Sequence, residues 1–207
     1  QTQNDSFKAV SKYFDRITRP EQIITSLPQA IQIMLDQADC GPATISISQD
    51  VQGEAFDYPE VFFEERIHEI RRIQPDQNQI KEAAKAIINS KQPIIISGGG
   101  VLYSEAEKEL SDFAKKHNIP VTPTVMGIGC MDCNDPYNIG PIGCLGVGSA
   151  NSLSKDTDLA LAIGTKLGDF TTGSWSNFHN ENFNLVSINT ARFDVTKHRA
   201  TPVISDA

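Results

Sequence analysis

The residues with the clearest chemical potential are three consecutive glycines, Gly98, Gly99 and Gly100, in the segment "PIIISGGGVLYSEAEKEL". An apolar strand pattern precedes them and a helical pattern follows, which is the layout of a phosphate-binding turn. In such a turn, main-chain N–H groups at the start of the helix bind the phosphate. The same layout also fits a tight strand-to-helix turn that needs glycine for a positive φ. Both interpretations stay open on these residues alone.

The dinucleotide-binding form of this motif is incomplete. Tyr103 stands where the third glycine belongs, and the next strand ends at Thr124 without the acid that contacts the ribose. Ser104 and Glu107 have the spacing of a capping box, which occupies two N–H donors at the helix start. Glu105 and Glu107 also place negative charge at the positive end of the helix dipole. Standard NAD binding is therefore disfavoured.

A second group of polar residues lies in "AIGTKLGDFTTGSW". Gly164 and Thr165 follow a buried strand, at the end of a parallel sheet where ligands of open α/β folds bind. Short polar side chains then follow closely: Asp169, Thr171, Thr172 and Ser174. They indicate either a ligand site or a loop held by its own Asx and Ser/Thr turns. A glycine series offers the same choice between close approach to a ligand and a compact loop: Gly127, Gly129, Gly140, Gly143, Gly146 and Gly148.

The cysteines and histidines do not form a clear catalytic or metal site. Cys130 and Cys133 are spaced as a Cys-x-x-Cys pair with Cys144 nearby, but zinc needs a fourth ligand. The nearest histidines, His117 and His179, belong to other predicted elements, so ordinary thiols are favoured. No nucleophile elbow occurs. Two acids of the same stretch, Asp132 and Asp135, are interpreted as solvated turn residues.

The elements that must position these residues alternate from Pro75 onward. Helical patterns cover 79–90, 104–117 and 150–154, and strand patterns cover 93–97, 119–124, 159–163 and 185–189, with a possible edge strand at 202–204. Alternating helices and strands imply right-handed crossovers. We therefore predict a doubly wound, mostly parallel, Rossmann-like α/β sheet in a domain spanning 76–207.

The first part of the chain has a different pattern. A helix-rich stretch with apolar Phe7, Val10, Phe14 and Ile17 is followed by a helix over 20–35 that we expect to be interrupted at Pro28, and then by a single strand over 44–48. Since a lone strand cannot satisfy its own backbone groups, we expect residues 1–52 to be the C-terminal remnant of a preceding domain. Residues 53–75, rich in acids and aromatics, are expected to form a connector.

Composition limits the classes of partner. The chain has 18 basic and 26 acidic side chains, a net charge of −8, and no basic run longer than two residues, which disfavours binding to nucleic acid or an anionic membrane. No apolar run is long enough to span a bilayer, and the N-terminus has no signal core. These features predict a cytoplasmic protein. The absence of an initiator Met leads us to expect a piece of a longer one.

Together these motifs resemble the thiamine-diphosphate enzyme family. "CGPATISISQDVQ" is similar to the end of the family's pyrimidine-binding domain, and "QPIIISGGGVLYSEAEKELSDFAKKHNIPVTPTVMGIG", "NIGPIGCLGVGSAN" and "TDLALAIGTKLGDF" are similar to successive parts of its central domain. "GDFTTGSW" and the connector most resemble the branch that opens the ring of a cyclic dione in inositol breakdown. Acetolactate-synthase-like carboligases and a non-catalytic nucleotide-binding module are the alternatives.

The resemblance implies that thiamine diphosphate and Mg²⁺ serve the full-length enzyme. The activating glutamate and the Gly-Asp-Gly motif of the family do not occur here, so the cofactor ligands lie outside this chain, which is expected to be inactive alone. The substrate would be a small cyclic dione, and the assembly a homodimer or homotetramer.

Some central domains of the family hold FAD or ADP in a crevice. The positions that match it here are Gly98, Gly99, Gly100, Thr124, Gly127, Gly164, Thr165, Asp169 and Phe170. Flavin-binding relatives usually place an acid, next to the adenosine, at the end of the strand that here ends in Ile188, Asn189 and Thr190, and this chain lacks that acid. The resemblance therefore favours an empty crevice.

Overall fold

The computed structural model describes residues 2–207, and the chain divides into two compact units, Gln1–Arg71 and Arg72–Ala207. We call these the N-terminal unit and the central unit and describe each by itself. The helices of the described residues are too short or too polar to cross a lipid bilayer.

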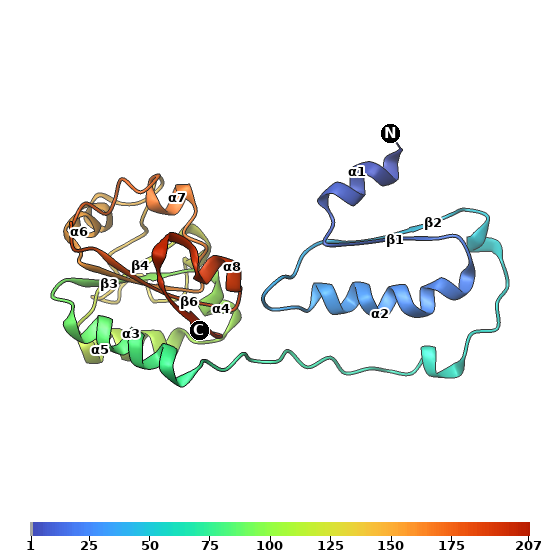
Figure 1. Cartoon of the computed structure of the whole chain (residues 1–207), viewed down its shortest axis with the longest axis horizontal. Helices are drawn as coiled ribbons and strands as arrows, with labels where there is room; N and C mark the ends of the chain where they lie inside the picture. The colour runs from blue at the N-terminus through green and yellow to red at the C-terminus, as the bar shows by residue number, and fades with distance from the viewer. Residues whose placement is uncertain (1) are drawn as a thin grey trace. The chain divides into compact units, whose positions relative to one another are not determined.

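The N-terminal unit is a small α/β arrangement. Its elements are α1 (Gln3–Val10), β1 (Tyr13–Ile17), the 3-10 turn η1 (Pro20–Gln22), α2 (Ile23–Met34) and β2 (Ala43–Ile47). Strand β1 pairs with β2 in parallel, and α2 connects the two (Figure 1).

Strand β1 corrects the sequence-based expectation that only one strand occurs before residue 55. Phe14 and Ile17 were expected in a helix because their spacing from Phe7 and Val10 suits a helical face. The helix instead ends at Val10 and is capped by Ser11, whose hydroxyl donates to the Phe7 carbonyl at 2.7 Å. The aromatic and β-branched residues that follow favour an extended backbone, and pairing with β2 satisfies it.

Helix α2 also differs from expectation, because it continues through Pro28. Proline inside a helix removes one main-chain hydrogen bond. On either side of it, Ser26 and Ala30 are buried, and the Ser26 hydroxyl donates to the carboxylate of Asp15 on β1. Tertiary packing of this face therefore holds the helix together across the proline.

The segment after β2 contains two 3-10 turns, η2 (Val51–Gly53) and η3 (Glu60–Phe62). Its aromatic rings pack on one another, with centroid separations between 4.9 and 6.0 Å among Phe56, Tyr58, Phe62 and Phe63. Residues 64–76 have no regular secondary structure.

The central unit is built on a five-stranded sheet of order β4-β3-β5-β6-β7, and every pairing in it is parallel (Figure 1). This confirms the predicted α/β class, including the edge strand near the end of the chain. The strands are β3 (Pro93–Ser97), β4 (Val121–Pro123), β5 (Leu159–Ile163), β6 (Asn184–Asn189) and β7 (Thr201–Ile204). The helices and 3-10 turns are α3 (Gln77–Asn89), α4 (Gly99–Tyr103), α5 (Glu107–His117), η4 (Val125–Gly127), α6 (Gly148–Asp156), α7 (Asp169–Thr172), α8 (Arg192–Val195) and η5 (Lys197–Arg199).

The core lies on both faces of this sheet, as the uninterrupted isoleucines of β3 require. Ile95 joins a cluster with residues of α3, α4 and α5, whereas Ile94 and Ile96 join a second cluster with Leu167 and Leu185. Successive side chains of a strand point to opposite faces, so each of the three contributes to one core only. A strand buried on both faces fixes the position of the loop that follows it.

The helix expected over 104–117 is two helices. Helix α4 begins at Gly99, two residues after the strand, and ends at Tyr103 with Ser104 as its C-cap. Glu105 then adopts a positive φ of 55° before α5 starts at Glu107. Ser104 is therefore at the end of a helix and not at its start. The predicted capping box with Glu107 is wrong, and the Ser104 hydroxyl instead donates to the carboxylate of Asp206 at 2.6 Å.

Candidate functional site at the carboxyl edge of the central sheet

The strand order places a topological switch between β3 and β5. The chain leaves β3 toward β4 on one side and leaves β5 toward β6 on the other, so the loops after the two strands diverge. Ligands of open α/β sheets bind at such a switch, beyond the carboxyl ends of the strands. The residues predicted for the crevice follow β3, β4 and β5, and the fold brings all of them to this edge: Gly98, Gly99, Gly100, Thr124, Gly127, Gly164, Thr165, Asp169 and Phe170.

The loops after β3 and β5 touch through their backbones at Gly98, Gly100 and Gly164, which we call the glycine crossing. The Gly98 N–H donates to the Ile163 carbonyl at 2.8 Å, and the Gly100 N–H donates to the Gly164 carbonyl at 3.0 Å. A Cβ on Gly98 would lie 2.2 Å from the Gly164 oxygen, and one on Gly100 would lie 2.5 Å from the Gly164 Cα. Both amides are therefore hydrogen bonded within the protein, and both glycines are required by close packing.

This geometry corrects one expectation about the turn. Among the described residues of the three-glycine segment none has a positive φ, and Gly98 itself is extended at −103°. The positive φ occurs across the crossing, at Gly164, with a value of 60°. The first glycines are needed for lack of a side chain, and Gly164 is needed for its conformation as well.

Thr124 and Gly127 fasten the η4 loop over the end of β3. The Thr124 N–H donates to the Ser97 carbonyl at 2.8 Å, and its hydroxyl accepts the Gly127 N–H at 3.1 Å. A Cβ on Gly127 would lie 2.1 Å from the Ser97 oxygen. Thr124 is almost fully buried, so its side chain serves the loop and does not face solvent.

The residues after β5 fall into two groups. Thr165 is buried, and its carbonyl accepts a hydrogen bond from the Asn189 side chain at 3.1 Å. Asp169 and Phe170, at the start of α7, are exposed, and Phe170 is 73% accessible as a residue. Of the nine predicted crevice residues, these two present their side chains most openly at the carboxyl edge.

Asn189 has a defined role that the sequence did not reveal. Its side chain donates to Thr165 and accepts the Ala191 N–H at 2.9 Å, so it bridges the loops after β5 and β6. The sequence indicated only that an acid is missing at this position. An asparagine offers both a donor and an acceptor, and both are used here.

Cys130 lies beneath the same edge and is fully buried. Its thiol lies 2.9 Å from the Ser97 hydroxyl as a hydrogen-bond donor, and burial raises the pKa of the thiol. It is therefore held neutral, unlike a nucleophilic thiolate. Cys133 and Cys144 are exposed, and no three His, Cys, Asp or Glu side chains within residues 2–207 lie together as a metal-binding group.

Asp135 departs from the expectation of a solvated turn acid. Its carboxylate is mostly covered and forms an ion pair with Lys115 of α5 at 2.8 Å. The bond from Lys115 is the first cause that lowers the pKa of Asp135, followed by the bond from the Tyr137 amide. This residue ties the glycine-rich loop to α5 and has a structural role.

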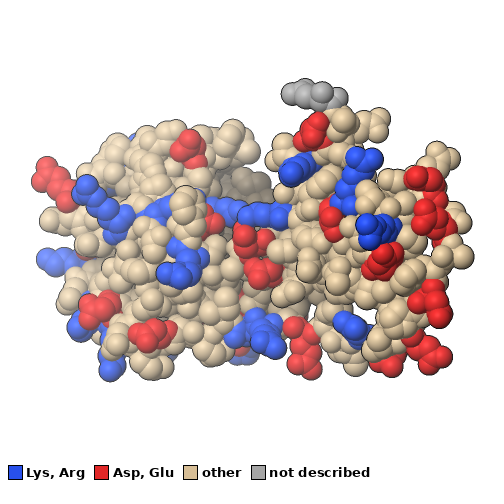
Figure 2. Space-filling model, turned by 45° about the vertical axis from the view of Figure 1, so that its right-hand side comes forward, with Lys and Arg blue, Asp and Glu red and all other residues tan. Residues whose placement is uncertain are grey.

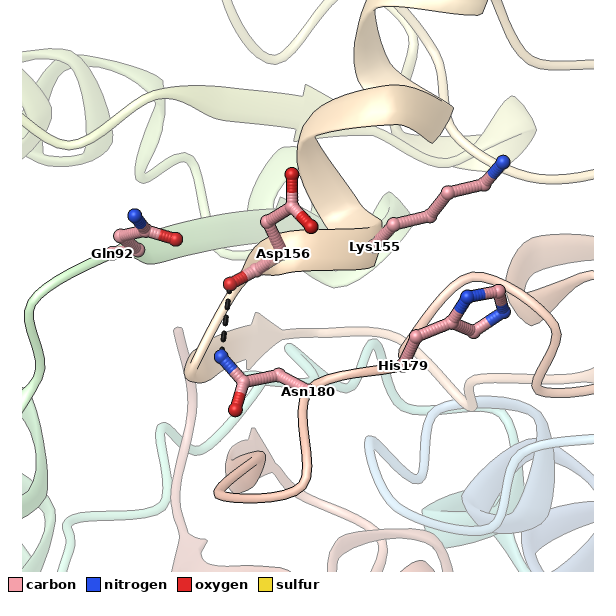
Figure 3. A pocket seen from close by; sticks show the side chains of 5 residues that line it. All are labelled: Gln92, Lys155, Asp156, His179 and Asn180. Carbon is pink, nitrogen blue, oxygen red and sulfur yellow. Dashed lines mark hydrogen bonds between the residues drawn. The ribbon is translucent and has the colours of Figure 1, made fainter.

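A surface depression lies at the opposite, amino edge of the sheet. It is open, measures about 400 Å³, and is lined by Gln92, Lys155, Asp156, His179 and Asn180 (Figure 3). The Asn180 side chain donates to the Asp156 carbonyl at 3.0 Å. None of the nine predicted residues lines this depression.

Lys and Arg side chains are interspersed with Asp and Glu over the face shown in Figure 2, so the surface charge of that face is mixed in sign.

Comparison with known proteins identifies relatives of the whole chain. A match to the family described as "Thiamine pyrophosphate enzyme, central domain" covers residues 80–207. Three similar proteins carry the name 3D-(3,5/4)-trihydroxycyclohexane-1,2-dione hydrolase. Those of Clostridium perfringens (strain 13 / Type A) and Clostridium tetani (strain Massachusetts / E88) are 45% identical over 206 residues, 100% of this chain and 32% of theirs. That of Bacillus thuringiensis (strain Al Hakam) is 45% identical over 204 residues, 99% of this chain and 32% of its own. The chain thus spans about a third of the length of these relatives.

Proposed function

The chain belongs to the thiamine pyrophosphate enzyme family, whose central domain its residues 80–207 match, and from this premise we propose the activity of the whole protein. We propose that the full-length protein is a hydrolase that opens the ring of a trihydroxycyclohexane-1,2-dione by breaking a carbon–carbon bond. The reaction would serve inositol breakdown in the cytoplasm.

The observation that carries this proposal is the extent of the 45% identity. The family match is confined to the central unit, but the similarity to the named hydrolases extends over all 206 aligned residues. It therefore includes the N-terminal unit and the connector. Carboligases of the same family would share the central fold, because a fold alone does not set the reaction.

We propose that the cofactors are bound outside this chain. Thiamine diphosphate supplies a carbanion equivalent that allows a bond next to a ketone to break, and Mg²⁺ would hold its diphosphate. The residues described here do not fit that role, because no cluster of carboxylates or other metal ligands occurs among them. The chain would thus contribute structure to the enzyme and would be inactive alone.

The proposed domain organisation follows the two units. Residues 1–52 would be the C-terminal remnant of a pyrimidine-binding domain, 53–75 a connector and 76–207 the central domain. The parallel β1-α2-β2 arrangement supports the first assignment, because two strands are too few for a stable sheet and are typical of part of a larger one. The full-length enzyme would be a homodimer or homotetramer.

For the carboxyl edge we propose a structural role in preference to nucleotide binding. The amides of Gly98 and Gly100 and the side chains of Thr124 and Asn189 all have internal partners. Calorimetric titration with FAD and with ADP is expected to give no saturable heat. Saturable binding of either one, lost in a Phe170→Ala variant, would contradict this proposal.

The activity itself is tested with the full-length enzyme. Thiamine-dependent consumption of the cyclic dione is the expected result, with pyruvate as the competing substrate of a carboligase. Turnover of pyruvate without turnover of the dione would overturn the proposed hydrolase and favour the acetolactate-synthase-like alternative.

A further inference from the structure

Three segments that are far apart in the sequence meet at the carboxylate of Asp206. They are the start of the central unit at residues 72–73, the end of α4 at residues 103–104, and residues 205–207, which follow β7. We call the three side chains that join them, Arg72, Ser104 and Asp206, the clasp.

Both oxygens of the Asp206 carboxylate are used. Arg72 Nη1 donates to Oδ2 at 2.8 Å, and the Ser104 hydroxyl donates to Oδ1 at 2.6 Å. The same Nη1 of Arg72 donates to the Tyr103 carbonyl at 2.9 Å. The Asp206 side chain is 17% exposed and that of Arg72 is 37% exposed. An ion pair that is partly covered and supported by further hydrogen bonds is stronger than an isolated surface pair.

Main-chain bonds reinforce the same junction. The Asp206 N–H donates to the Ile73 carbonyl at 3.0 Å, and the Ala207 N–H donates to the Ser104 hydroxyl at 3.2 Å. The break at Glu105, with its positive φ, ends α4 at this point. The carbonyl of Tyr103 is then in the last turn of a helix, where carbonyls lack a helical donor, and Arg72 supplies one.

We propose that the clasp anchors the end of the connector, and that Asp206 is the positioning residue that sets how much of the connector is free to move. The boundary between the two units falls at Arg71, one residue before the clasp. Residues 64–76 have no regular structure, and the next helix begins at Gln77. When the clasp is closed, the part of the connector that is free to move ends at Arg71. When the clasp opens, that part extends to the start of α3.

Trypsin provides a direct test on the full chain, because the connector carries its own reference site. Cleavage after Arg72 requires its side chain to leave the clasp, whereas Arg66 is exposed and its side chain forms no hydrogen bond or ion pair among the described residues. Proteolysis of a transiently opened segment follows the population of the open form. An Asp206→Asn variant is therefore expected to raise cleavage after Arg72, relative to cleavage after Arg66, by roughly fivefold.

Two further variants keep the test decisive. Ser104→Ala removes the bond to Asp206 and the acceptor of the Ala207 N–H but leaves the ion pair. It is expected to raise the ratio by roughly threefold, and it serves alone if Asp206→Asn does not fold. Glu105→Gln removes an exposed acid beside the clasp and should leave the ratio unchanged. Equal cleavage after Arg72 and Arg66 in the unaltered chain, or a ratio unaffected by Ser104→Ala, would overturn the proposal.

Discussion

The two edges of the central sheet are held together by different kinds of interaction. At the carboxyl edge, the loops after β3 and β5 join through main-chain hydrogen bonds at the glycine crossing, where Gly98, Gly100 and Gly164 lack side chains. At the amino edge, the turn before β3 joins the start of β5 mainly through side chains: the Thr157 hydroxyl donates to the Gln92 carbonyl, and Asp158 makes the larger set of bonds. Its carboxylate accepts bonds from the Ser90 hydroxyl and from the Lys91 and Gln92 amides, the last two at 2.7 and 3.0 Å.

This difference predicts which changes each edge tolerates. An edge joined by backbone is sensitive to any added side chain but insensitive to pH, because no titrating group takes part. An edge joined by a carboxylate is sensitive to the loss of one charge and to acid. The chain has a single tryptophan, Trp175, which lies in the central unit. Its fluorescence during urea unfolding therefore reports on both edges.

The largest effect is expected for Gly100→Ala at the glycine crossing. Gly100 lies inside α4, so helix propensity alone predicts stabilisation of about 1 kcal/mol. The added Cβ would instead lie 2.5 Å from the Gly164 Cα and 3.0 Å from the Gly164 carbonyl oxygen, and both are backbone atoms. We expect the free energy of unfolding to fall by about 3 kcal/mol or more. Helix propensity predicts a gain in stability and the steric clash predicts a loss, so urea denaturation of Gly100→Ala distinguishes the two effects by the sign of the change.

Gly168→Ala is the matched control for the crossing. Gly168 also lies at the carboxyl edge, but a Cβ there has no neighbour within 4 Å, and its φ is −69°. Its stability should change by less than about 0.5 kcal/mol. If Gly100→Ala and Gly168→Ala change the free energy of unfolding equally, close packing at the glycine crossing is not what holds the loops after β3 and β5 together.

The second prediction concerns the amino edge. Asp158→Asn keeps the shape of the side chain but removes its charge. It also replaces one acceptor oxygen by an NH₂ group, which is a donor and cannot accept a bond from the Lys91 or Gln92 amide. Hydrogen bonds to charged groups are worth more than neutral ones, so we expect a loss of about 2 kcal/mol. Asp156→Asn is the control, because that carboxylate is exposed on the same edge and accepts no bond among the described residues. Equal losses from the two variants would contradict the role of Asp158.

The sequence predicted the sheet well and the joints between its loops poorly. The buried strands 93–97 and 159–163 match β3 and β5 because an unbroken apolar run with flanking glycine or polar residues is a local signal. Parallel topology then placed all the predicted crevice residues at one edge. The bonds of Asn189, Asp158 and Ser104 were not predictable, since each joins residues that are distant in sequence. Ser104 was misassigned because its local spacing fits a capping box as well as a helix end.

The third prediction is a pH dependence that Asp158 gives to the amino edge and that the glycine crossing lacks. Burial raises the pKa of Asp158, but the bonds from Ser90, Lys91 and Gln92 outweigh it, and the net effect lowers the pKa. The contribution of Asp158 is therefore fully present above its unfolded pKa of about 4. It is lost as the pH falls through the lower folded-state value.

Urea denaturation between pH 7 and pH 3 measures this effect. The stability difference between the unaltered chain and Asp158→Asn should be largest at neutral pH and should shrink below about pH 4. The difference between the unaltered chain and Gly100→Ala should stay constant over the same range. A constant difference for Asp158→Asn would show that its carboxylate is not the linking group.

The smallest effect is expected for Thr124→Val, which tests how far the carboxyl edge depends on side chains at all. The substitution removes the hydroxyl that accepts the Gly127 N–H, but the same N–H also donates to the Thr124 carbonyl at 2.9 Å. The main-chain bond from Thr124 to Ser97 is untouched. Because the donor keeps a partner, we expect a loss of no more than about 1 kcal/mol. A loss larger than that of Asp158→Asn would mean that both edges rely on side-chain bonds, and the contrast between them would fail.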